Sequence, residues 1–271
     1  MRTRAATALE RILAETRKEV ERRKRESPLD AATAASGPRA GAKRPFLDAV
    51  LAPGVSVIAE FKRRSPSAGT LREAPDLESV LAAYCRGGAA ALSILTDGPN
   101  FGGSLEDLRA ARASCGLPLL RKDFIVDPYQ LQEAQAAGAD AVLLIVAALE
   151  ARSLAALYGA AREMGLDVLV EVHDRGELDT ALELDVDILG INNRDLRDFS
   201  VDVRRTERLL DDVPAGVAVV SESGIADADQ LARLHERGVQ AVLVGEALMR
   251  SPDPADALRS LRRFSAAHDT L

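Results

Sequence analysis

A carboxylate and an ammonium group stand two positions apart at the end of an apolar run. The run covers Val55–Phe61 and contains Glu60, and Lys62 follows directly after it. Residues i and i+2 of a β-strand point to the same face, so Glu60 and Lys62 face one common volume. Charged groups at the end of a buried strand are unfavourable unless they pair or take part in chemistry. This pair therefore predicts an enzyme that uses acid and base groups.

The overall composition limits the class of protein. The chain has 271 residues, of which 47% are hydrophobic, and this suffices for one large domain with a complete core. A net charge of −7 argues against a general attraction to nucleic acid or anionic membranes. No apolar stretch has the length of a membrane span, and the N-terminus lacks the apolar core of a signal peptide. Cys85 and Cys115 lack metal-ligand spacing and indicate reduced thiols, so we expect a cytoplasmic protein.

Short β-rich runs recur along the chain, separated by segments with helical periodicity such as 105–113, 128–137, 151–163 and 228–237. Gly88, Gly138 and Gly238 precede three of the runs, as expected for a helix C-cap followed by a buried parallel strand. Eight such β/α units predict a (β/α)8 TIM barrel, because a doubly wound sheet normally has fewer strands and a glycine-rich first turn. The runs are Val55–Phe61, Ala90–Leu95, Leu117–Lys122, Ala141–Val146, Val168–Val172, Ile188–Asn192, Val217–Ser221 and Ala241–Gly245.

The segment before the first run predicts an N-terminal helical extension over residues 1–45, with the catalytic barrel over residues 46–271. Leu9, Ile12, Leu13 and Val20 have the spacing of an amphipathic helix. The following Ala31–Gly41 stretch is rich in Ala, Ser and Gly and predicts a flexible connector. We expect the helix to cap the bottom of the barrel, to cover the mouth of the site, or to do both.

Polar residues follow nearly every predicted strand, while the strand interiors are aliphatic. Barrels of this kind carry their active sites at the C-terminal ends of the strands, and a structural protein has no reason to gather polar groups on one rim. The strand-end groups are Glu60 and Lys62, Thr96–Asp97, Arg121–Phe124, Glu171–His173, Asn192–Asp195, Ser221–Gly224 and Gly245–Glu246.

Five strings at these strand ends, in chain order, resemble indole-3-glycerol-phosphate synthase. The likeness touches every β/α unit. The resemblance implies conversion of 1-(2-carboxyphenylamino)-1-deoxyribulose 5-phosphate to indole-3-glycerol phosphate, a step toward tryptophan, with loss of carbon dioxide and water. It also implies that no metal or organic cofactor is used. The strings are AEFKRRSPS at Ala59–Ser67, LLRKDFIVDPY at Leu119–Tyr129, LVEVH at Leu169–His173, GINNRDL at Gly190–Leu196 and SESGI at Ser221–Ile225.

Ring closure needs an acid at the ketone oxygen, because negative charge develops there when the aryl carbon attacks. We expect Lys122 to be this acid, and the resemblance implies the same. Dehydration needs a base and an acid. Glu171 is the expected base, and Lys62 is a candidate acid that Glu60 orients, although the role of each lysine stays open. The expected catalytic set is Glu60, Lys62, Lys122, Glu171, Asn192, Glu222 and Ser223.

The substrate phosphate is expected at the ends of the last two strands. Ser223–Gly224 and Gly245–Glu246 each precede a helical stretch, where free backbone N–H groups suit an anion. Members of the resembled family often carry Ser where this chain has Glu246. We therefore expect the Glu246 side chain to point away from the phosphate while its backbone N–H still donates.

The remaining parts of the substrate call for polar and apolar contacts. Ser65 and Ser67 are expected to hold the substrate carboxylate, Asn192 can bond its hydroxyls, and Arg194 offers a planar fork to an anion. The aryl ring needs apolar walls. Candidates for these walls are Phe101, Phe124, Leu143 and Phe199.

Two other functions stay open. A phosphoribosylanthranilate isomerase would use Cys with Asp, and neither cysteine lies at a strand end. The chain could also be a catalytically silent barrel that serves as a binding subunit. The presence of both Lys122 and Glu171 argues against this function. His173 has no histidine neighbour in sequence and predicts a hydrogen-bonded structural residue rather than a metal ligand. The expected partner is a small phosphorylated substrate, bound by a monomer or weak homo-oligomer.

Overall fold

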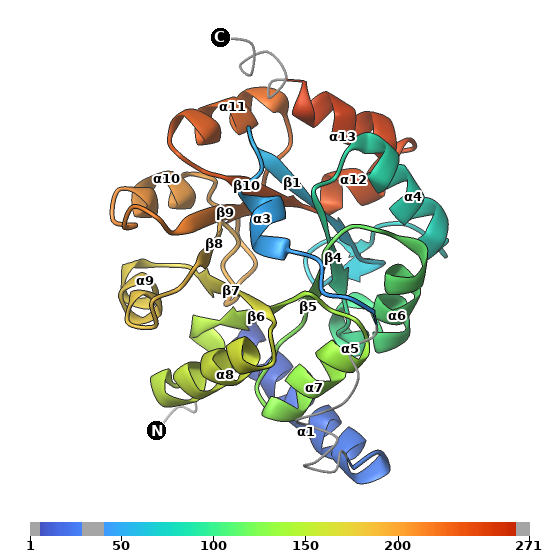
Figure 1. Cartoon of the computed structure of the whole chain (residues 1–271), viewed down its shortest axis with the longest axis vertical. Helices are drawn as coiled ribbons and strands as arrows, with labels where there is room; N and C mark the ends of the chain where they lie inside the picture. The colour runs from blue at the N-terminus through green and yellow to red at the C-terminus, as the bar shows by residue number, and fades with distance from the viewer. Residues whose placement is uncertain (1–5, 29–40, 264–271) are drawn as a thin grey trace.

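Parallel strands close into a barrel surrounded by helices, as Figure 1 shows for this computed structural model, which describes residues 6–28 and 41–263. The strand order around the barrel is β1-β10-β9-β8-β7-β6-β5-β4. Chain neighbours are therefore barrel neighbours throughout, as in a TIM barrel. The strands are β1 (Ser56–Phe61), β4 (Ala91–Leu95), β5 (Leu119–Lys122), β6 (Ala141–Ile145), β7 (Asp167–Val172), β8 (Ile188–Asn192), β9 (Ala218–Glu222) and β10 (Ala241–Val244).

Helices follow the strands and cover the outside of the barrel. Asp or Ser side chains accept a backbone N–H at the start of most of them, for example Asp76, Ser104 and Asp174, which satisfies donors that an uncapped helix leaves unpaired. The helices are α4 (Leu77–Gly87), α5 (Gly98–Phe101), α6 (Leu105–Ser114), α7 (Pro128–Ala136), α8 (Ala151–Glu163), α9 (Arg175–Leu182), α10 (Arg204–Leu210), α11 (Ala228–Glu236), α12 (Glu246–Arg250) and α13 (Pro254–Arg262), with a 3-10 turn η1 (Val146–Ala148) and a hairpin of β2 (Arg64–Ser65) and β3 (Gly69–Thr70).

The predicted strands are confirmed, with shifts of one or two residues at their ends. The run predicted to begin at Leu117 begins at Leu119, because Pro118 has no N–H to donate to the ladder. The seventh strand runs one residue further than predicted and ends at Glu222. Gly88, Gly138 and Gly238 adopt positive φ angles of +86°, +90° and +91°, as a helix C-terminal turn requires.

The helices that precede β1 lie at opposite ends of the barrel. The short helix α3 (Phe46–Val50) lies across the start of the strands, where Phe46 and Leu47 donate their backbone N–H groups to Asp167 at the first residue of β7. Helix α1 (Ala8–Glu26) begins with a capping box formed by Thr7 and Glu10. The predicted connector lies, except for its last residue, outside the described residues.

Helix α1 is attached to α7, which begins just after the C-terminal end of β5. Lys24 donates to Asp127 at 2.6 Å, the Tyr129 hydroxyl donates to the Ser27 carbonyl at 3.0 Å, and Arg23 pairs with Glu133 at 2.9 Å. The end of α1 therefore lies on the side of the barrel where the strands end, opposite to α3.

A buried arginine connects this attachment to the barrel wall. Arg121 is fully buried on β5, next to Lys122 in the chain, and pairs with Asp123 at 2.8 Å and with Glu133 at 3.2 Å. It also donates to the Thr96 hydroxyl and to the Gln130 carbonyl. A buried guanidinium is tolerated only when such partners satisfy its donors.

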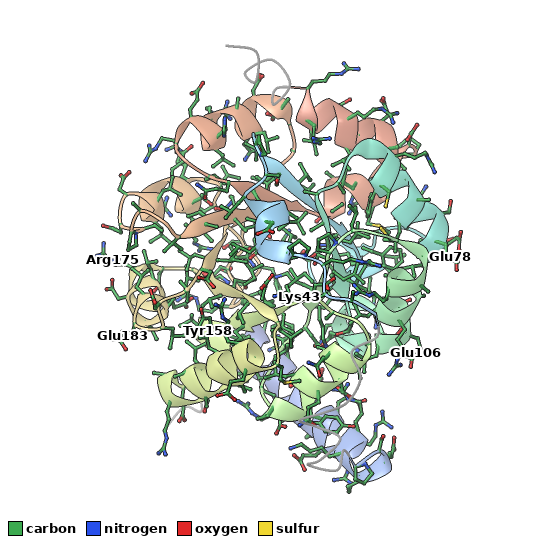
Figure 2. The ribbon with its side chains drawn as sticks, in the orientation of Figure 1. Lys43, Glu78, Glu106, Tyr158, Arg175 and Glu183 are labelled. Carbon is green, nitrogen blue, oxygen red and sulfur yellow. The ribbon has the colours of Figure 1, made fainter. Side chains whose placement is uncertain are left out.

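The apolar core has two parts. Side chains on the outer face of the strands, such as Leu92 and Leu144, pack against the helices, and inward-facing ones, such as Ile58 and Leu169, fill the barrel. Several charged side chains lie at the surface, and Figure 2 shows Glu78, Glu106, Arg175 and Glu183 at the periphery. No helix in the described part of the chain has the length and apolar character needed to cross a membrane.

Candidate active site

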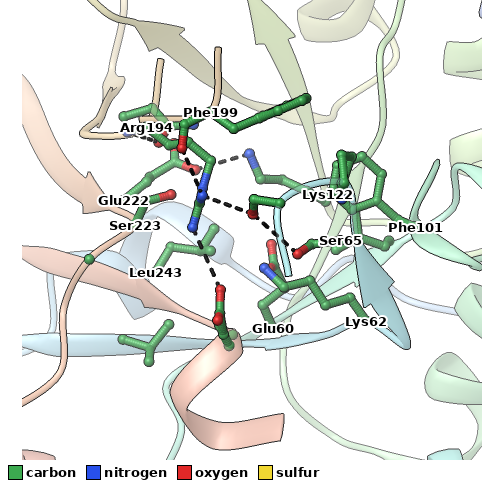
Figure 3. Close-up of a pocket in the computed structure, with 18 of the residues that line it drawn as sticks. Glu60, Lys62, Ser65, Phe101, Lys122, Arg194, Phe199, Glu222, Ser223 and Leu243 are labelled. Carbon is green, nitrogen blue, oxygen red and sulfur yellow. Dashed lines mark hydrogen bonds and ion pairs between the residues drawn. The ribbon is translucent and has the colours of Figure 1, made fainter. Parts of the chain in front are cut away.

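A cavity of about 490 Å³ opens at the C-terminal ends of the strands. Figure 3 shows side chains from the strand ends and from loops pointing into it. Every residue that the sequence singled out as catalytic or substrate-binding lines this one cavity. Those residues are Glu60, Lys62, Ser65, Ser67, Phe101, Lys122, Phe124, Leu143, Glu171, Asn192, Arg194, Phe199, Glu222, Ser223, Gly224, Gly245 and Glu246.

Lys122 lies between two buried carboxylates at the base of the cavity. Its Nζ is 2.7 Å from Oε2 of Glu171 and 3.0 Å from Oε2 of Glu222. Both glutamates are 1% exposed, so neither charge is screened by solvent. The three residues come from β5, β7 and β9, which alternate around the barrel and send inward-facing side chains to one layer.

The charges in this layer determine one another's protonation. Burial alone would lower the pKa of Lys122, but the nearby carboxylates of Glu171, Glu222 and Glu60 raise it above its usual range. Burial would raise the pKa of Glu171, and Lys122 together with His173 holds it well below the usual range. The pKa of Glu222 is raised to about 7, since burial and the neighbouring Glu171 outweigh Lys122. The layer thus contains an ammonium donor, an ionised carboxylate and a carboxyl that titrates near neutrality.

A second ion pair faces the same space from β1. Lys62 donates to Oε1 of Glu60 at 2.5 Å, and Glu60 is 3% exposed. The ion pair confirms the prediction that these side chains face one common volume, although β1 ends one residue before Lys62. A Cβ at Gly245 would overlap the Glu60 carboxylate, so the glycine makes room for it.

A second glycine makes room for Glu222, and sequence reasoning missed it. Gly190 lies on β8 opposite Glu171 in the register of β7, and a Cβ there would overlap Oε1 of Glu222. Glycine inside a strand often marks such a close approach. Its place in the middle of an apolar strand was the available signal.

Arg194 crosses the mouth of the cavity, as Figure 3 shows. It donates to the Ser67 hydroxyl at 2.9 Å and to the Phe199 carbonyl at 3.1 Å, and its guanidinium lies 3.6 Å from Glu246. Glu246 lines the cavity with its carboxylate between Arg194 and Arg250, and its orientation relative to the substrate phosphate stays a prediction. Two guanidinium groups within reach explain this orientation, and Arg250 was missed.

Aromatic side chains form one wall. The rings of Phe101 and Phe124 lie 6.4 Å apart between centroids, tilted by 35°. Together with Leu143 on β6, they give this side of the cavity an apolar lining. The opposite side contains backbone turns with positive φ at Ser223 (+64°) and Gly224 (+78°).

Several other candidates lie outside this cavity. His173 is 7% exposed and lies behind Glu171, and its ring contacts Glu171 and Glu177. Cys85 and Cys115 are free thiols whose Sγ atoms are 2.9 Å apart, away from the lining residues. Within residues 6–28 and 41–263, no cluster of His, Cys, Asp and Glu has the arrangement of a metal site.

The fold is similar to that of other solved barrel structures. A 3-hexulose-6-phosphate synthase from Salmonella typhimurium superimposes with a TM-score of 0.60 over 79% of this chain and 100% of its own, at 16% identity. A tryptophan synthase structure from Pyrococcus furiosus gives a TM-score of 0.54 over 79% of this chain and 99% of its own, at 15% identity. At these identities the likeness shows the fold alone.

Closer relatives are found by sequence. An indole-3-glycerol phosphate synthase 2 from Streptomyces coelicolor is 51% identical over 218 residues, which are 80% of this chain and 84% of that protein. An indole-3-glycerol phosphate synthase from Aromatoleum aromaticum is 49% identical over 258 residues, 95% of this chain and 93% of that protein. The family model described as indole-3-glycerol phosphate synthase matches residues 9–261. This chain belongs to the indole-3-glycerol phosphate synthase family of carboxy-lyases.

Proposed function

We propose that the cavity closes the pyrrole ring of indole-3-glycerol phosphate, with Lys122 as the acid of the first step. The substrate would be 1-(2-carboxyphenylamino)-1-deoxyribulose 5-phosphate. The single observation that carries this proposal is the Lys122 ammonium, held between Glu171 and Glu222 within an apolar-walled cavity. An ammonium at that place stabilises the oxyanion that forms when the aryl carbon attacks the ketone.

The later steps use groups already present around Lys122. After the carbon–carbon bond forms, loss of carbon dioxide restores the aromatic ring without a dedicated base. Dehydration then needs a proton removed and a hydroxyl expelled with acid assistance. Glu171, ionised at neutral pH, is the proposed base, and Lys62, oriented by Glu60, is the proposed acid. Glu222 holds Lys122 from the other side.

Binding would be divided between the two sides of the cavity. The aromatic wall of Phe101, Phe124 and Leu143, completed by Phe199, would hold the aryl ring. Ser65, Ser67 and Arg194 would hold the substrate carboxylate. The backbone at Gly224 and Gly245 would receive the phosphate, with Ser223 beside it and with Asn192 bonding the hydroxyls.

The test is turnover followed by the fluorescence of indole-3-glycerol phosphate. Lys122→Ala and Glu171→Gln should each abolish turnover, because removing a general acid or base costs about 10²–10⁴ in rate. That loss corresponds to about 3–5 kcal/mol of barrier. Circular dichroism checks that both variants fold. Activity within about threefold of wild type in either variant, well short of that loss, would remove that residue from the mechanism.

A further inference from the structure

His173 lies directly behind Glu171 and does not line the cavity. Glu171 is on β7 and His173 follows the end of that strand, two positions further along the chain. Nε2 of His173 is 3.3 Å from Oε1 of Glu171, while Oε2 of the same carboxylate contacts Lys122. Neither Nε2 nor Oε1 forms a hydrogen bond with any described residue, so their 3.3 Å contact is an ion pair without hydrogen-bond geometry. Two buried polar atoms without other partners thus face each other.

The other ring nitrogen is held by a second carboxylate. Glu177 Oε2 accepts from the backbone N–H of His173 at 2.8 Å and lies 2.9 Å from Nδ1. Glu177 is itself fixed in the first turn of α9, where its backbone N–H donates to the N-cap Asp174 at 3.0 Å. The imidazole is therefore clamped from the side remote from the cavity.

The arrangement favours a hydrogen on both ring nitrogens, because each one faces a carboxylate oxygen. Burial alone would lower the pKa of His173, but Glu171 and Glu177 raise it to about 9. The elements packed against the ring add no opposing charge: β6, η1 and β8 contain no titratable residue, and the charged residues of α8 are exposed. On α9, Arg175 is exposed and pairs with Asp179 and Asp212.

We propose that His173 is the positioning residue of Glu171: clamped by Glu177, it fixes the far oxygen of the carboxylate and leaves the near oxygen to face Lys122 and the cavity. This inference rests on the proposed role of Glu171 as base. His173 touches no reacting atom, since Glu171 separates it from the cavity. Because it is already protonated, it holds the base in place and does not shuttle a proton.

This role has a consequence for the pH profile. A cation behind Glu171 disfavours protonation of that carboxylate, so the base stays ionised at lower pH. Removing the cation should raise the pKa of Glu171, and activity should then fall at a higher pH than in the wild type. A neighbouring charge shifts a pKa by about 1–3 units. If His173 had only a structural role, its replacement would change the stability of the protein but not the pH at which activity falls on the acid side of the profile (the acid limb).

The variants are His173→Gln, which keeps an N–H donor without the charge, and Glu177→Gln, which releases the clamp. Asp174→Asn is the matched control, because it removes an adjacent carboxylate that contacts neither ring nitrogen and can still cap α9. We expect the acid limb of kcat against pH to move up by about one unit or more in the first two variants and to stay in the control. The plateau kcat should fall by about 10- to 100-fold in His173→Gln with KM little changed.

Ring-nitrogen NMR supplies a readout that needs no substrate. The chain has three histidines, so the signals of His173 are assigned by their loss in His173→Gln. In the wild type this ring should titrate near pH 9, and in Glu177→Gln it should titrate at lower pH. An ordinary titration near pH 6.5 in the wild type, or unmoved acid limbs in both variants, would overturn the inference.

The same measurements separate this inference from the proposed function. If Glu171→Gln keeps its activity, the base assignment fails, whatever His173 does. If Glu171→Gln is inactive but the acid limbs of His173→Gln and Glu177→Gln coincide with that of the wild type, the base assignment stands and the positioning role of His173 is refuted.

Discussion

Gly190→Ala tests whether the space beside Glu222 is essential to the site. The added Cβ would overlap Oε1 of Glu222 and come within 3.3 Å of Leu169 Cδ1, both inside the packed barrel. Either the carboxylate or the backbone of β8 must move. Overpacking of this kind costs about 1–3 kcal/mol of unfolding free energy. For a chain of this size that lowers the melting temperature by roughly 2–10 °C.

The activity should fall by more than the stability change explains. Displacing Glu222 disturbs its 3.0 Å contact with Lys122, and a misplacement of about 1 Å can cost up to about 10²-fold in rate. Turnover is followed by product fluorescence, and stability by thermal unfolding. Gly159→Ala is the matched control: this helical glycine has nothing within 4 Å of an added Cβ, so the change should stabilise α8 by about 0.5–1 kcal/mol and leave kcat unchanged.

A double-mutant cycle isolates the clash. In a Glu222→Ala background the carboxylate is gone, so Gly190→Ala should cost about 1 kcal/mol less stability than it does in the wild type. Equal costs in the two backgrounds, or wild-type stability and turnover in Gly190→Ala itself, would refute the view that Gly190 exists to admit Glu222.

Two further predictions concern buried charges. The pKa of Glu222 is raised to about 7, which means that the folded state binds a proton more tightly than the unfolded chain. The free energy of unfolding should therefore fall as the pH rises from about 4.5 to 7. Denaturant titrations at several pH values measure this slope, and Glu222→Gln should abolish the part that comes from Glu222. Arg121→Met should lower the free energy of unfolding by about 3–5 kcal/mol in the same assay, because Asp123 and Glu133 lose a buried partner. An unchanged denaturation midpoint would contradict this prediction.

The order of strands and the polar rim could be predicted because they are properties of local pattern. Apolar runs, glycine punctuation and helical periodicity define each β/α unit, and the barrel brings the strand ends to one face. Glu60, Lys62 and Glu171 were found in this way. The observed strand ends differ from the predicted ones where Pro118 delays the start of β5 and where β9 extends one residue further, to Glu222.

What could not be predicted depends on neighbours across the barrel. Nothing in the chain order indicates that Gly190 faces Glu222, that Glu246 turns toward Arg194, or that Arg121 points outward to α7. These contacts join side chains from separate elements, and their geometry follows from packing and not from spacing along one strand.

Glu133 is shared by two arginines, one on the barrel strand β5 and one on the terminal helix α1. A variant that lacks α1 would leave the Glu133 carboxylate paired with one arginine instead of two. The packing around β5, the strand that carries Lys122, would then be less stable. We therefore expect α1 to unfold together with the barrel, so that deletion of this helix lowers the melting temperature of the whole protein.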